Sequence, residues 1–265
     1  MKPISEILLA DARALRGLLF DLDDTFLSHG VLTRDAYGSL WDLKAAGLRL
    51  VAVTGRPHSW GEFAVRQWPI DGAVTENGAL SVKRIGAVLE RVDPIDPTER
   101  HSRRVRLASL VEEVRAIVPE ARLSDDVEGR VSDVTWDIGE RVKLPDDRIE
   151  MIEEAIQKSG ARTFRSSVHL HASYDEADKA KGSFAFLSRE FGESEADAFS
   201  RYAYIGDSGN DAACFAAFKT TLGVANVQAH LARIPVPPKY VTIGERGAGF
   251  REAAAQILLL RAAER

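Results

Sequence analysis

Three short apolar runs, each ending in a cluster of acidic, hydroxyl or glycine residues, constrain the fold of this chain most strongly. The runs cover residues 18–20, 48–53 and 202–205. Short apolar runs of this kind are typical of strands that are buried on both faces of a parallel sheet. Between the first two runs, the spacing of apolar residues predicts a helix with Thr33 as its N-cap and Gly47 as its C-cap. This strand–helix–strand order predicts an α/β fold with helices on both faces of the sheet.

The middle of the chain follows a different pattern, in which helical periodicity is mixed with strand-like alternation. This mixture favours an α+β insert over a continuation of the parallel core. The predicted helices cover residues 98–117 and 146–159, and the predicted strands cover residues 131–138 and 163–171. We therefore expect a core formed by residues 1–82 and 179–265, with an inserted domain over residues 83–178 and a helix over residues 179–191.

Composition excludes several classes of protein. The chain has 265 residues and a net charge of −5, so a nucleic-acid-binding module is disfavoured by the lack of a basic excess. No apolar stretch approaches the roughly 18 residues of a membrane span. Glu6 and Asp11 interrupt the N-terminal apolar stretch, which favours a short amphipathic helix over a secretory signal. The single cysteine, Cys214, cannot form an internal disulfide, which fits a cytoplasmic protein.

The first polar cluster is the segment FDLDDT, residues 20–25, in which Asp21 and Asp23 are two positions apart. On an extended segment their side chains lie on the same side, where two carboxylates repel unless a cation lies between them. A hard divalent cation such as Mg²⁺ suits these oxygen ligands. One carboxylate can then act as a nucleophile toward phosphorus and the other as a general acid and base. The alternative is an ordinary polar turn after a strand.

Two further segments carry groups that can bind phosphate. The segment VAVTGR, residues 51–56, places the Thr54 hydroxyl and Gly55 at a strand end, where the hydroxyl and backbone amides can contact a phosphate. Lys181, before Gly182 at a predicted helix start, can neutralise a phosphoryl group and a carboxylate together. Lys179 competes for that role. An ordinary turn and a solvated lysine are the alternatives.

The last cluster is GDSGND, residues 206–211, which follows the third apolar run. Asp207 and Asp211 supply two more carboxylates, and the glycines permit a tight loop, so the segment fits a metal-binding loop. An Asp/Gly/Asn turn is the alternative. Because ligand crevices lie at the carboxyl ends of parallel strands, we expect all these clusters to converge there.

In their order and context, the four segments resemble the four motifs of the haloacid dehalogenase-like hydrolase superfamily. The segment TENGA, residues 75–79, and the segment KGSFAFL, residues 181–187, resemble subfamily IIB, the Cof-like phosphatases with a type-2 cap. Asp24 departs from the commoner DxDGT pattern. The resemblance implies a Rossmann-like core and an aspartyl-phosphate intermediate on Asp21, with Asp23 as acid and base. It also implies phosphate binding by Thr54, Gly55, Lys181 and Asn210, and a Mg²⁺ site formed by Asp21, the Asp23 backbone carbonyl, Asp207 and Asp211.

We therefore expect a Mg²⁺-dependent phosphatase that acts on a small phosphorylated metabolite, most simply a phosphosugar. A phosphomutase and a non-catalytic phospho-ligand-binding protein remain alternatives. Arg130 is the candidate substrate contact in the inserted cap, against the alternative of a solvated sheet face. His169 and His171 are expected to be strand-surface residues near the hinge between cap and core. The sequence indicates neither the substrate nor the oligomeric state.

Overall fold

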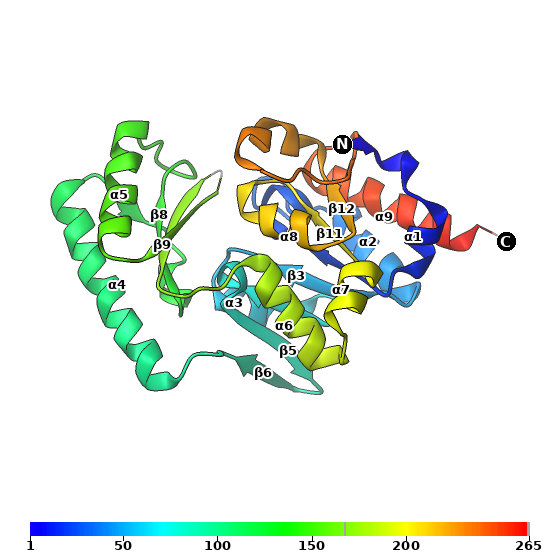
Figure 1. Ribbon diagram of the computed structural model, residues 1–265, viewed down its shortest axis with the longest axis horizontal. Helices are drawn as coiled ribbons and strands as arrows, with labels where there is room; N and C mark the ends of the chain where they lie inside the picture. The colour runs from blue at the N-terminus through cyan, green and yellow to red at the C-terminus, as the bar shows by residue number, and fades with distance from the viewer. Residues whose placement is uncertain (167, 264–265) are drawn as a thin grey trace.

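Two sheets organise the computed structural model, which describes residues 1–166 and 168–263 (Figure 1). The large sheet has nine strands in the order β1-β13-β12-β11-β2-β3-β4-β5-β6. In this order, each strand from β1 to β4 is parallel to its neighbour. At the other edge, β5 pairs antiparallel with β4, and β6 pairs antiparallel with β5. The strands are β1 (Lys2–Pro3), β2 (Gly17–Phe20), β3 (Arg49–Val53), β4 (Gly72–Thr75), β5 (Leu80–Ile85), β6 (Val88–Val92), β11 (Tyr202–Gly206), β12 (Thr220–Gly223) and β13 (Tyr240–Val241).

Helices cover both faces of the large sheet, as the sequence predicts. Alternate residues of each strand pack on opposite faces, so that Leu18 and Phe20 of β2 belong to one apolar cluster and Leu19 to the other. The first face is covered by α1 (Leu9–Ala14), α2 (Arg34–Ala45), α3 (His58–Gln67) and α9 (Arg246–Ala262). The second face is covered by α6 (Lys179–Phe191), α7 (Glu195–Arg201) and α8 (Ala212–Ala217). The predicted α/β fold is therefore confirmed.

The predicted local elements are largely present. The Thr33 hydroxyl accepts a hydrogen bond from the Ala36 amide at the start of α2, and Gly47 follows the helix with a φ of 80°. The predicted N-terminal helix is divided into a 3₁₀ turn, Ile4–Glu6, and the short helix α1. No helix in the described part of the chain is long and apolar enough to cross a membrane.

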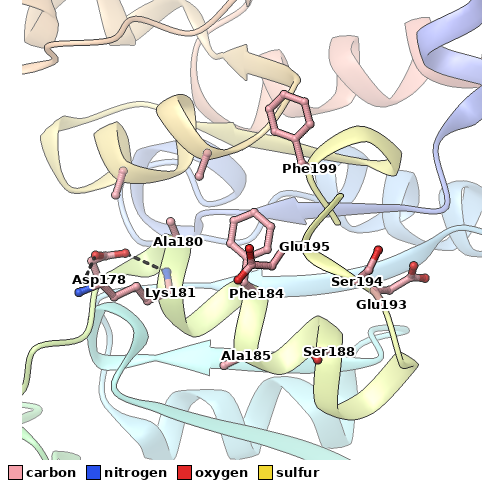
Figure 2. A pocket seen from close by; sticks show the side chains of 12 residues that line it. Asp178, Ala180, Lys181, Phe184, Ala185, Ser188, Glu193, Ser194, Glu195 and Phe199 are labelled. Carbon is pink, nitrogen blue, oxygen red and sulfur yellow. Dashed lines mark hydrogen bonds and ion pairs between the residues drawn. The ribbon is translucent and has the colours of Figure 1, made fainter. Parts of the chain in front are cut away.

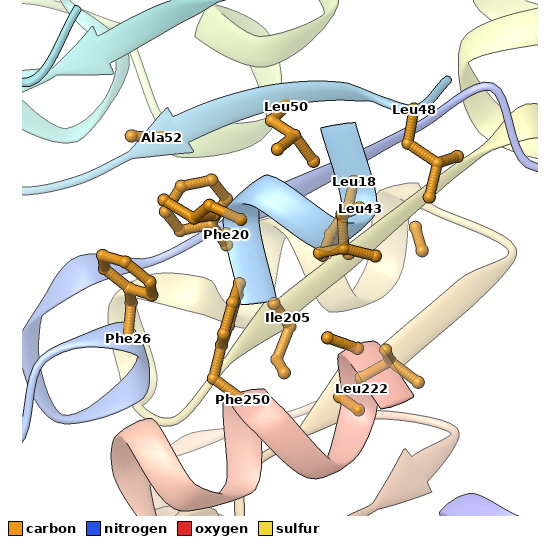
Figure 3. Close-up of a cluster of buried hydrophobic side chains, with 14 of the residues drawn as sticks. Leu18, Phe20, Phe26, Leu43, Leu48, Leu50, Ala52, Ile205, Leu222 and Phe250 are labelled. Carbon is orange, nitrogen blue, oxygen red and sulfur yellow. The ribbon is translucent and has the colours of Figure 1, made fainter. Parts of the chain in front are cut away.

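An aromatic cluster supports the carboxyl end of β2 (Figure 3). The ring of Phe20 lies 5.2 Å from that of Phe26 and 5.4 Å from that of Phe250, measured between centroids. Phe26 and Phe250 are 4.9 Å apart in an edge-on arrangement, which is favourable for aromatic pairs. The cluster therefore packs the segment after β2, which carries Asp21 and Asp23, against the C-terminal helix α9.

The smaller sheet is antiparallel, with the order β7-β8-β10-β9. Two helices pack on it through their own apolar cluster, separate from those of the large sheet. Its elements are α4 (Pro97–Ile117), β7 (Arg122–Leu123), β8 (Asp133–Asp137), α5 (Asp146–Lys158), β9 (Arg162–Arg165) and β10 (His169–Ser173). We call residues 97–173 the small unit; it lies to one side of the large sheet in Figure 1.

One predicted strand of this region is wrong. Residues 163–171 do not form a single strand, because the chain reverses within them and Leu170 of β10 pairs antiparallel with Arg165 of β9. The chain crosses between the large sheet and the small unit twice, through residues 93–96 and residues 174–178. The strands β5 and β6 precede the first crossing and belong to the large sheet, so the first residues of the insert expected over residues 83–178 pair with the core instead.

Candidate active site

The carboxylates of Asp21 and Asp207 lie together because their strands are neighbours. Each residue directly follows a strand, β2 for Asp21 and β11 for Asp207, and the two strands pair in parallel with Ile205 opposite Phe20. Asp21, Asp207 and Asp211 are buried, and one carboxylate oxygen from each lies within 4.8 Å of the other two. The predicted convergence of the first and last acidic clusters is therefore present in the structure.

Asp211 differs from the other two because both of its oxygens already accept two hydrogen bonds. Oδ2 accepts from the backbone amides of Asp207, at 2.9 Å, and Ser208, at 3.0 Å. Oδ1 accepts from Lys179 Nζ, at 2.7 Å, and from the Tyr204 hydroxyl, at 2.6 Å. A carboxylate has about four lone-pair positions, so this arrangement leaves Asp211 without a free one for a cation. The sequence expectation that Asp211 ligates a metal is not supported by these contacts.

The lysine at this cluster is Lys179. Its Nζ atom is buried and donates to Asp21 Oδ1 at 2.6 Å and to Asp211 Oδ1 at 2.7 Å. An ammonium group between two buried carboxylates offsets part of their repulsion.

Lys181, which the sequence analysis favoured, does not reach the cluster. Its side chain is 65% exposed and its Nζ atom donates to the backbone carbonyl of Glu176. Figure 2 shows it at a different place, a groove of about 810 Å³ between α6, α7 and α8, beside Asp178. Lys179 and Lys181 are two residues apart on one helix, so they point in different directions.

Burial governs the electrostatics of the cluster. It raises the pKa of Asp21 to about 7, with Asp211 and Asp23 adding to the increase and Lys179 opposing it. Burial and the neighbouring Asp21 also raise the pKa of Asp207 well above its usual range. The pKa of Lys179 is raised by Asp21 and Asp211, whose attraction exceeds the effect of burial. The site therefore gathers more carboxyl groups than its one ammonium group can stabilise in the ionised form.

Asp23 lies at the mouth of the cluster, with its side chain 43% exposed. Arg56 orients its carboxylate, because the guanidinium Nε atom lies 3.0 Å from Oδ1 and 2.9 Å from Oδ2. The guanidinium carbon of Arg56 in turn lies 4.0 Å from the ring centroid of Trp60, in a cation–π contact. Arg56 is the last residue of the VAVTGR segment, and no pattern in the sequence predicts the contact between Arg56 and Asp23.

The expected phosphate-binding residues Thr54, Gly55 and Asn210 lie around the same cluster. The Thr54 hydroxyl is buried and accepts a hydrogen bond from the Arg56 amide at 3.0 Å, which leaves its hydrogen available to donate. Asn210 donates to Asn77 Oδ1 at 3.3 Å, and a Cβ atom on Gly55 would lie 3.1 Å from that same oxygen. Asn77 belongs to the TENGA segment, so that segment is part of the site.

Asn226 is a residue of the site that the sequence analysis missed. Its side-chain amide donates to Asp207 Oδ2 and to the Asp24 backbone carbonyl, both at 3.0 Å. Its Oδ1 atom accepts from the backbone amide of Arg246, whose side chain pairs with the Asp24 carboxylate at 2.8 Å. The unusual Asp24 therefore has its own counter-charge. No motif marked Asn226, which lies in the 3₁₀ helix Ala225–Arg233 after β12.

A polar cleft of about 50 Å³ joins these residues to the small unit. The rest of the chain, which contains the large sheet and which we call the large unit, lines the cleft with seven residues: Asp21, Asp23, Gly55, Arg56, Asp207, Ser208 and Asn210. The small unit lines it with Arg130, Glu140, Ser166, Val168, His169 and His171. His169 and His171 therefore line the cleft, whereas the sequence predicted strand-surface residues near the hinge. His169 Nε2 lies 2.9 Å from Glu140 Oε2, and His171 Nδ1 lies 2.9 Å from Asp133 Oδ2.

Arg130 lines this cleft, but its side chain is only 1% exposed. Its guanidinium group pairs with the carboxylates of Asp126 and Asp133 and donates to the Gly55 backbone carbonyl at 3.0 Å. These partners take up four of the five N–H donors of the guanidinium group. The contacts favour a structural role at the border between the two units over the substrate contact expected from the sequence.

The donor set at the cluster fits a hard divalent cation. Asp21 and Asp207 present carboxylate oxygens, the ligands that Mg²⁺ prefers, in a buried place where a cation would offset the repulsion between the two groups. Asp207 Oδ1 and Oδ2 each accept one hydrogen bond, from Thr25 and Asn226, and so retain lone pairs. Asp21 and Asp207 can therefore hold the ion, and the Asp23 backbone carbonyl stays a predicted ligand.

No known protein-family profile matches the sequence, and no curated protein sequence matches it significantly. Solved structures, in contrast, resemble most of the chain. A haloacid dehalogenase-like hydrolase from Bacteroides thetaiotaomicron is 16% identical, with a TM-score of 0.67 over 92% of this chain and 99% of that one. The C-terminal domain of trehalose-6-phosphate phosphatase from C. albicans is 13% identical, with a TM-score of 0.68 over 100% of both chains.

A third structure, the sucrose-phosphatase from a Synechocystis species in complex with sucrose and phosphate, is 15% identical. Its TM-score is 0.64, over 92% of this chain and 98% of that one. These similarities show that the chain has the fold of the haloacid dehalogenase-like hydrolases. The resemblance inferred from the four motifs is therefore confirmed for the fold.

Proposed function

We propose that the protein is a Mg²⁺-dependent phosphatase that hydrolyses a small phosphate monoester through an aspartyl-phosphate on Asp21. One observation carries this proposal: Asp21, Asp207 and Lys179 meet in a buried cluster, and Asp23 stands at its mouth. A buried carboxylate paired with an ammonium group is a nucleophile shielded from water. A partly exposed carboxylate beside it can exchange protons with a leaving group and with solvent.

In the first step, a carboxylate oxygen of Asp21 attacks phosphorus, and the bond from phosphorus to the leaving oxygen breaks. Asp23 gives a proton to that oxygen, so the leaving group departs as a neutral alcohol. In the second step, Asp23 takes a proton from a water molecule, whose oxygen attacks the phosphorus and releases Asp21. Arg56 holds the Asp23 carboxylate in position through its two contacts with Nε. Both steps balance, and Asp21 and Asp23 return to their starting states.

The remaining groups would bind the phosphate and the ion. We assign Lys179, the Thr54 hydroxyl, the Gly55 amide and Asn210 to the phosphoryl oxygens, since they surround the cluster on the side of the large unit. Mg²⁺ held by Asp21 and Asp207 would supply positive charge that offsets the charge of the phosphoryl group. We assign to Asp211 the positioning of Lys179, because its oxygens are already occupied.

We further propose that the substrate is a phosphosugar and that the small unit, residues 97–173 of the insert expected over residues 83–178, acts as the cap. The small unit brings polar groups to the cleft, including the His169–Glu140 pair and Ser166, which suit the hydroxyl groups of a sugar. Two proteins of similar fold are named as phosphatases of sugar phosphates. The cleft of about 50 Å³ is too small for a phosphosugar, so the cap must move to admit one. We propose a cytoplasmic location, where such metabolites occur.

The test is release of inorganic phosphate from p-nitrophenyl phosphate and from a panel of sugar phosphates by the purified protein. We expect multiple turnovers with Mg²⁺ present, none after treatment with EDTA, and recovery when Mg²⁺ is added back. Analysis of the same reactions for isomerised sugar phosphates distinguishes hydrolysis from a mutase reaction. Turnover that persists in metal-free buffer, or binding of phosphate esters without turnover, would contradict the proposal.

A further inference from the structure

The turn after β4 adopts an unusual backbone conformation. Three consecutive residues have positive φ angles: 50° at Glu76, 53° at Asn77 and 102° at Gly78. Residues other than glycine adopt this conformation rarely, and it persists only where surrounding contacts fix it. A Cβ atom on Gly78 would lie 2.0 Å from the carbonyl oxygen of Asp178, so glycine is required there. The turn is therefore fixed between β4 and the start of α6.

This turn buries the carboxylate of Glu76 among donors that come mainly from the small unit. Oε1 accepts from the His58 amide at 3.0 Å and from the Val131 amide at 3.0 Å. Oε2 accepts from the amide and the hydroxyl of Ser132, both at 2.6 Å. Three of these four donors belong to residues 131–132, which directly precede β8. The carboxylate therefore joins the large sheet to the small unit without a covalent link.

On the side of the small unit, the bound segment is tied to both chain crossings. The carbonyl of Ser132 accepts from the Ser173 hydroxyl at 2.8 Å, at the end of β10. Arg100 of α4 is buried and donates to both oxygens of Asp93, at 2.7 and 2.8 Å, in the first crossing. It also donates to both oxygens of Asp175, at 2.8 and 2.7 Å, in the second crossing. Hydrogen bonds and ion pairs therefore connect the attachment at Glu76 with both chain crossings.

On the side of the large sheet, the turn is bonded to the loop that carries the expected phosphate-binding residues. The Glu76 amide donates to the Arg56 carbonyl, and the Asn77 amide donates to the Thr54 carbonyl, both at 3.1 Å. Next to Ser132, Asp133 accepts from His171, which lines the cleft. A short series of contacts thus leads from the Thr54–Arg56 loop through Glu76 to the cleft-lining face of the small unit.

We propose that Glu76 is a positioning residue, a third and noncovalent attachment that sets where the small unit sits over Asp21 and Asp23. Removing a carboxylate from water is costly, and here donors of the small unit offset that cost. These donors offset the cost only while residues 131–132 are hydrogen-bonded to Glu76. The kinetic part of this inference rests on the proposed phosphatase function, whereas the structural part does not.

The first experiment measures amide hydrogen exchange in the wild-type protein and the Glu76→Gln variant. The carboxamide of glutamine turns an NH₂ group toward donors and cannot accept all four hydrogen bonds. We expect exchange at Val131 and Ser132 to become at least about fivefold faster, with β2 and β11 unchanged. The matched control is Glu193→Gln, which removes another buried carboxylate; its partners in the described part of the chain, Arg16, Arg49 and Tyr202, lie outside the small unit.

The second experiment measures KM and kcat for p-nitrophenyl phosphate in a cycle of Glu76→Gln, Ser132→Ala and the double variant. We expect KM to rise about three- to tenfold in Glu76→Gln, with a smaller change in kcat. The double variant should resemble Glu76→Gln, because both changes break the same attachment. Glu193→Gln should stay within about twofold of the wild type.

The proposal is overturned if exchange at residues 131–132 is unchanged in Glu76→Gln, or if Glu193→Gln has the same effect there. It is equally overturned if the effects of Glu76→Gln and Ser132→Ala multiply, as for independent sites. Should Glu76→Gln fail to fold, Ser132→Ala alone must show the faster exchange. A wild-type protein without phosphatase activity would contradict the proposed function, while the exchange data would still test the attachment.

Discussion

The Nζ atom of Lys179 donates a 2.6 Å hydrogen bond to Oδ1 of Asp21, in a contact closed to solvent. This contact places the positive charge of α6 directly against the carboxylate that we propose as the nucleophile. It fixes one oxygen of Asp21 and leaves the other free to react. A buried charge pair of this kind is strongly destabilised when one partner is removed.

The first prediction compares Lys179→Met with Lys181→Met. Loss of Lys179 removes a cation that stabilises the phosphoryl group, and loss of such a group in other enzymes lowers kcat by about 10²–10³-fold. We expect that loss in Lys179→Met, and a change within about twofold in Lys181→Met, measured with p-nitrophenyl phosphate. Equal losses in the two variants would contradict the assignment of Lys179.

A helical face in the sequence could have identified the correct lysine. Lys179, Ser183, Phe186 and Leu187 are buried together on α6, at the spacing of three and four residues that marks one face of a helix. Lys181 lies off that face. The motif comparison favoured Lys181 because it precedes Gly182, whereas the periodicity of the same segment points to Lys179.

The strands that carry Asp21, Thr54 and Asp207 could be predicted because a parallel sheet buried on both faces needs short, continuous apolar runs. The contacts of Glu76 and Arg130 could not. They join residues about 55 and 75 positions apart in the sequence, across the border between two units, and no local pattern marks such pairs. The sequence does not indicate the reversal between β9 and β10, because both strands are short and carry polar residues at the ends where the chain reverses.

The second prediction concerns Arg130→Ala. Because the Arg130 side chain is buried between Asp126 and Asp133, its removal leaves those carboxylates without their counter-charge. We expect the free energy of unfolding to fall by about 3–5 kcal/mol, measured by denaturant titration. Activity on p-nitrophenyl phosphate and on sugar phosphates should fall together. Unchanged stability with a higher KM for sugar phosphates alone would restore the substrate role expected from the sequence.

The third prediction places substrate recognition at His169 instead. Its ring is partly exposed in the cleft and paired with Glu140, so it can bind a hydroxyl group of the leaving group. We expect His169→Ala to raise KM for the preferred sugar phosphate about fivefold or more, as for loss of one hydrogen bond. Kinetics with p-nitrophenyl phosphate serve as the comparison and should change little. Equal effects on both substrates would argue against this role.

The fourth prediction concerns the pH dependence of stability. Burial and the nearby Asp133 raise the pKa of Glu76 to about 7 from its usual 4.5, although hydrogen bonds from Ser132 and Val131 oppose the increase. Between these values the folded protein keeps a proton that the unfolded chain has lost, so the free energy of unfolding falls as the pH rises. Arg130 and His58 also lie near this carboxylate, so the Glu76→Gln variant provides the reference.

Denaturant titrations of the wild type and Glu76→Gln at pH 5 and pH 8 test this prediction. The stability advantage of the wild type over the variant should shrink by roughly 1–3 kcal/mol at the higher pH, since one pKa unit corresponds to about 1.4 kcal/mol. An advantage that stays constant would show that Glu76 ionises normally, and one that grows with pH would show that its pKa is lowered; either result contradicts the prediction.

The central claim is that Asp21 is the nucleophile, and kcat of the Asp21→Asn variant with p-nitrophenyl phosphate and Mg²⁺ tests it most directly. Asparagine keeps the shape of the side chain and loses the charge that attacks phosphorus, so the covalent route is closed. We expect kcat of Asp21→Asn to fall by about 10³-fold or more, while the unfolding transition of the variant remains cooperative. A folded Asp21→Asn variant that retains kcat within about tenfold of the wild type would contradict the claim.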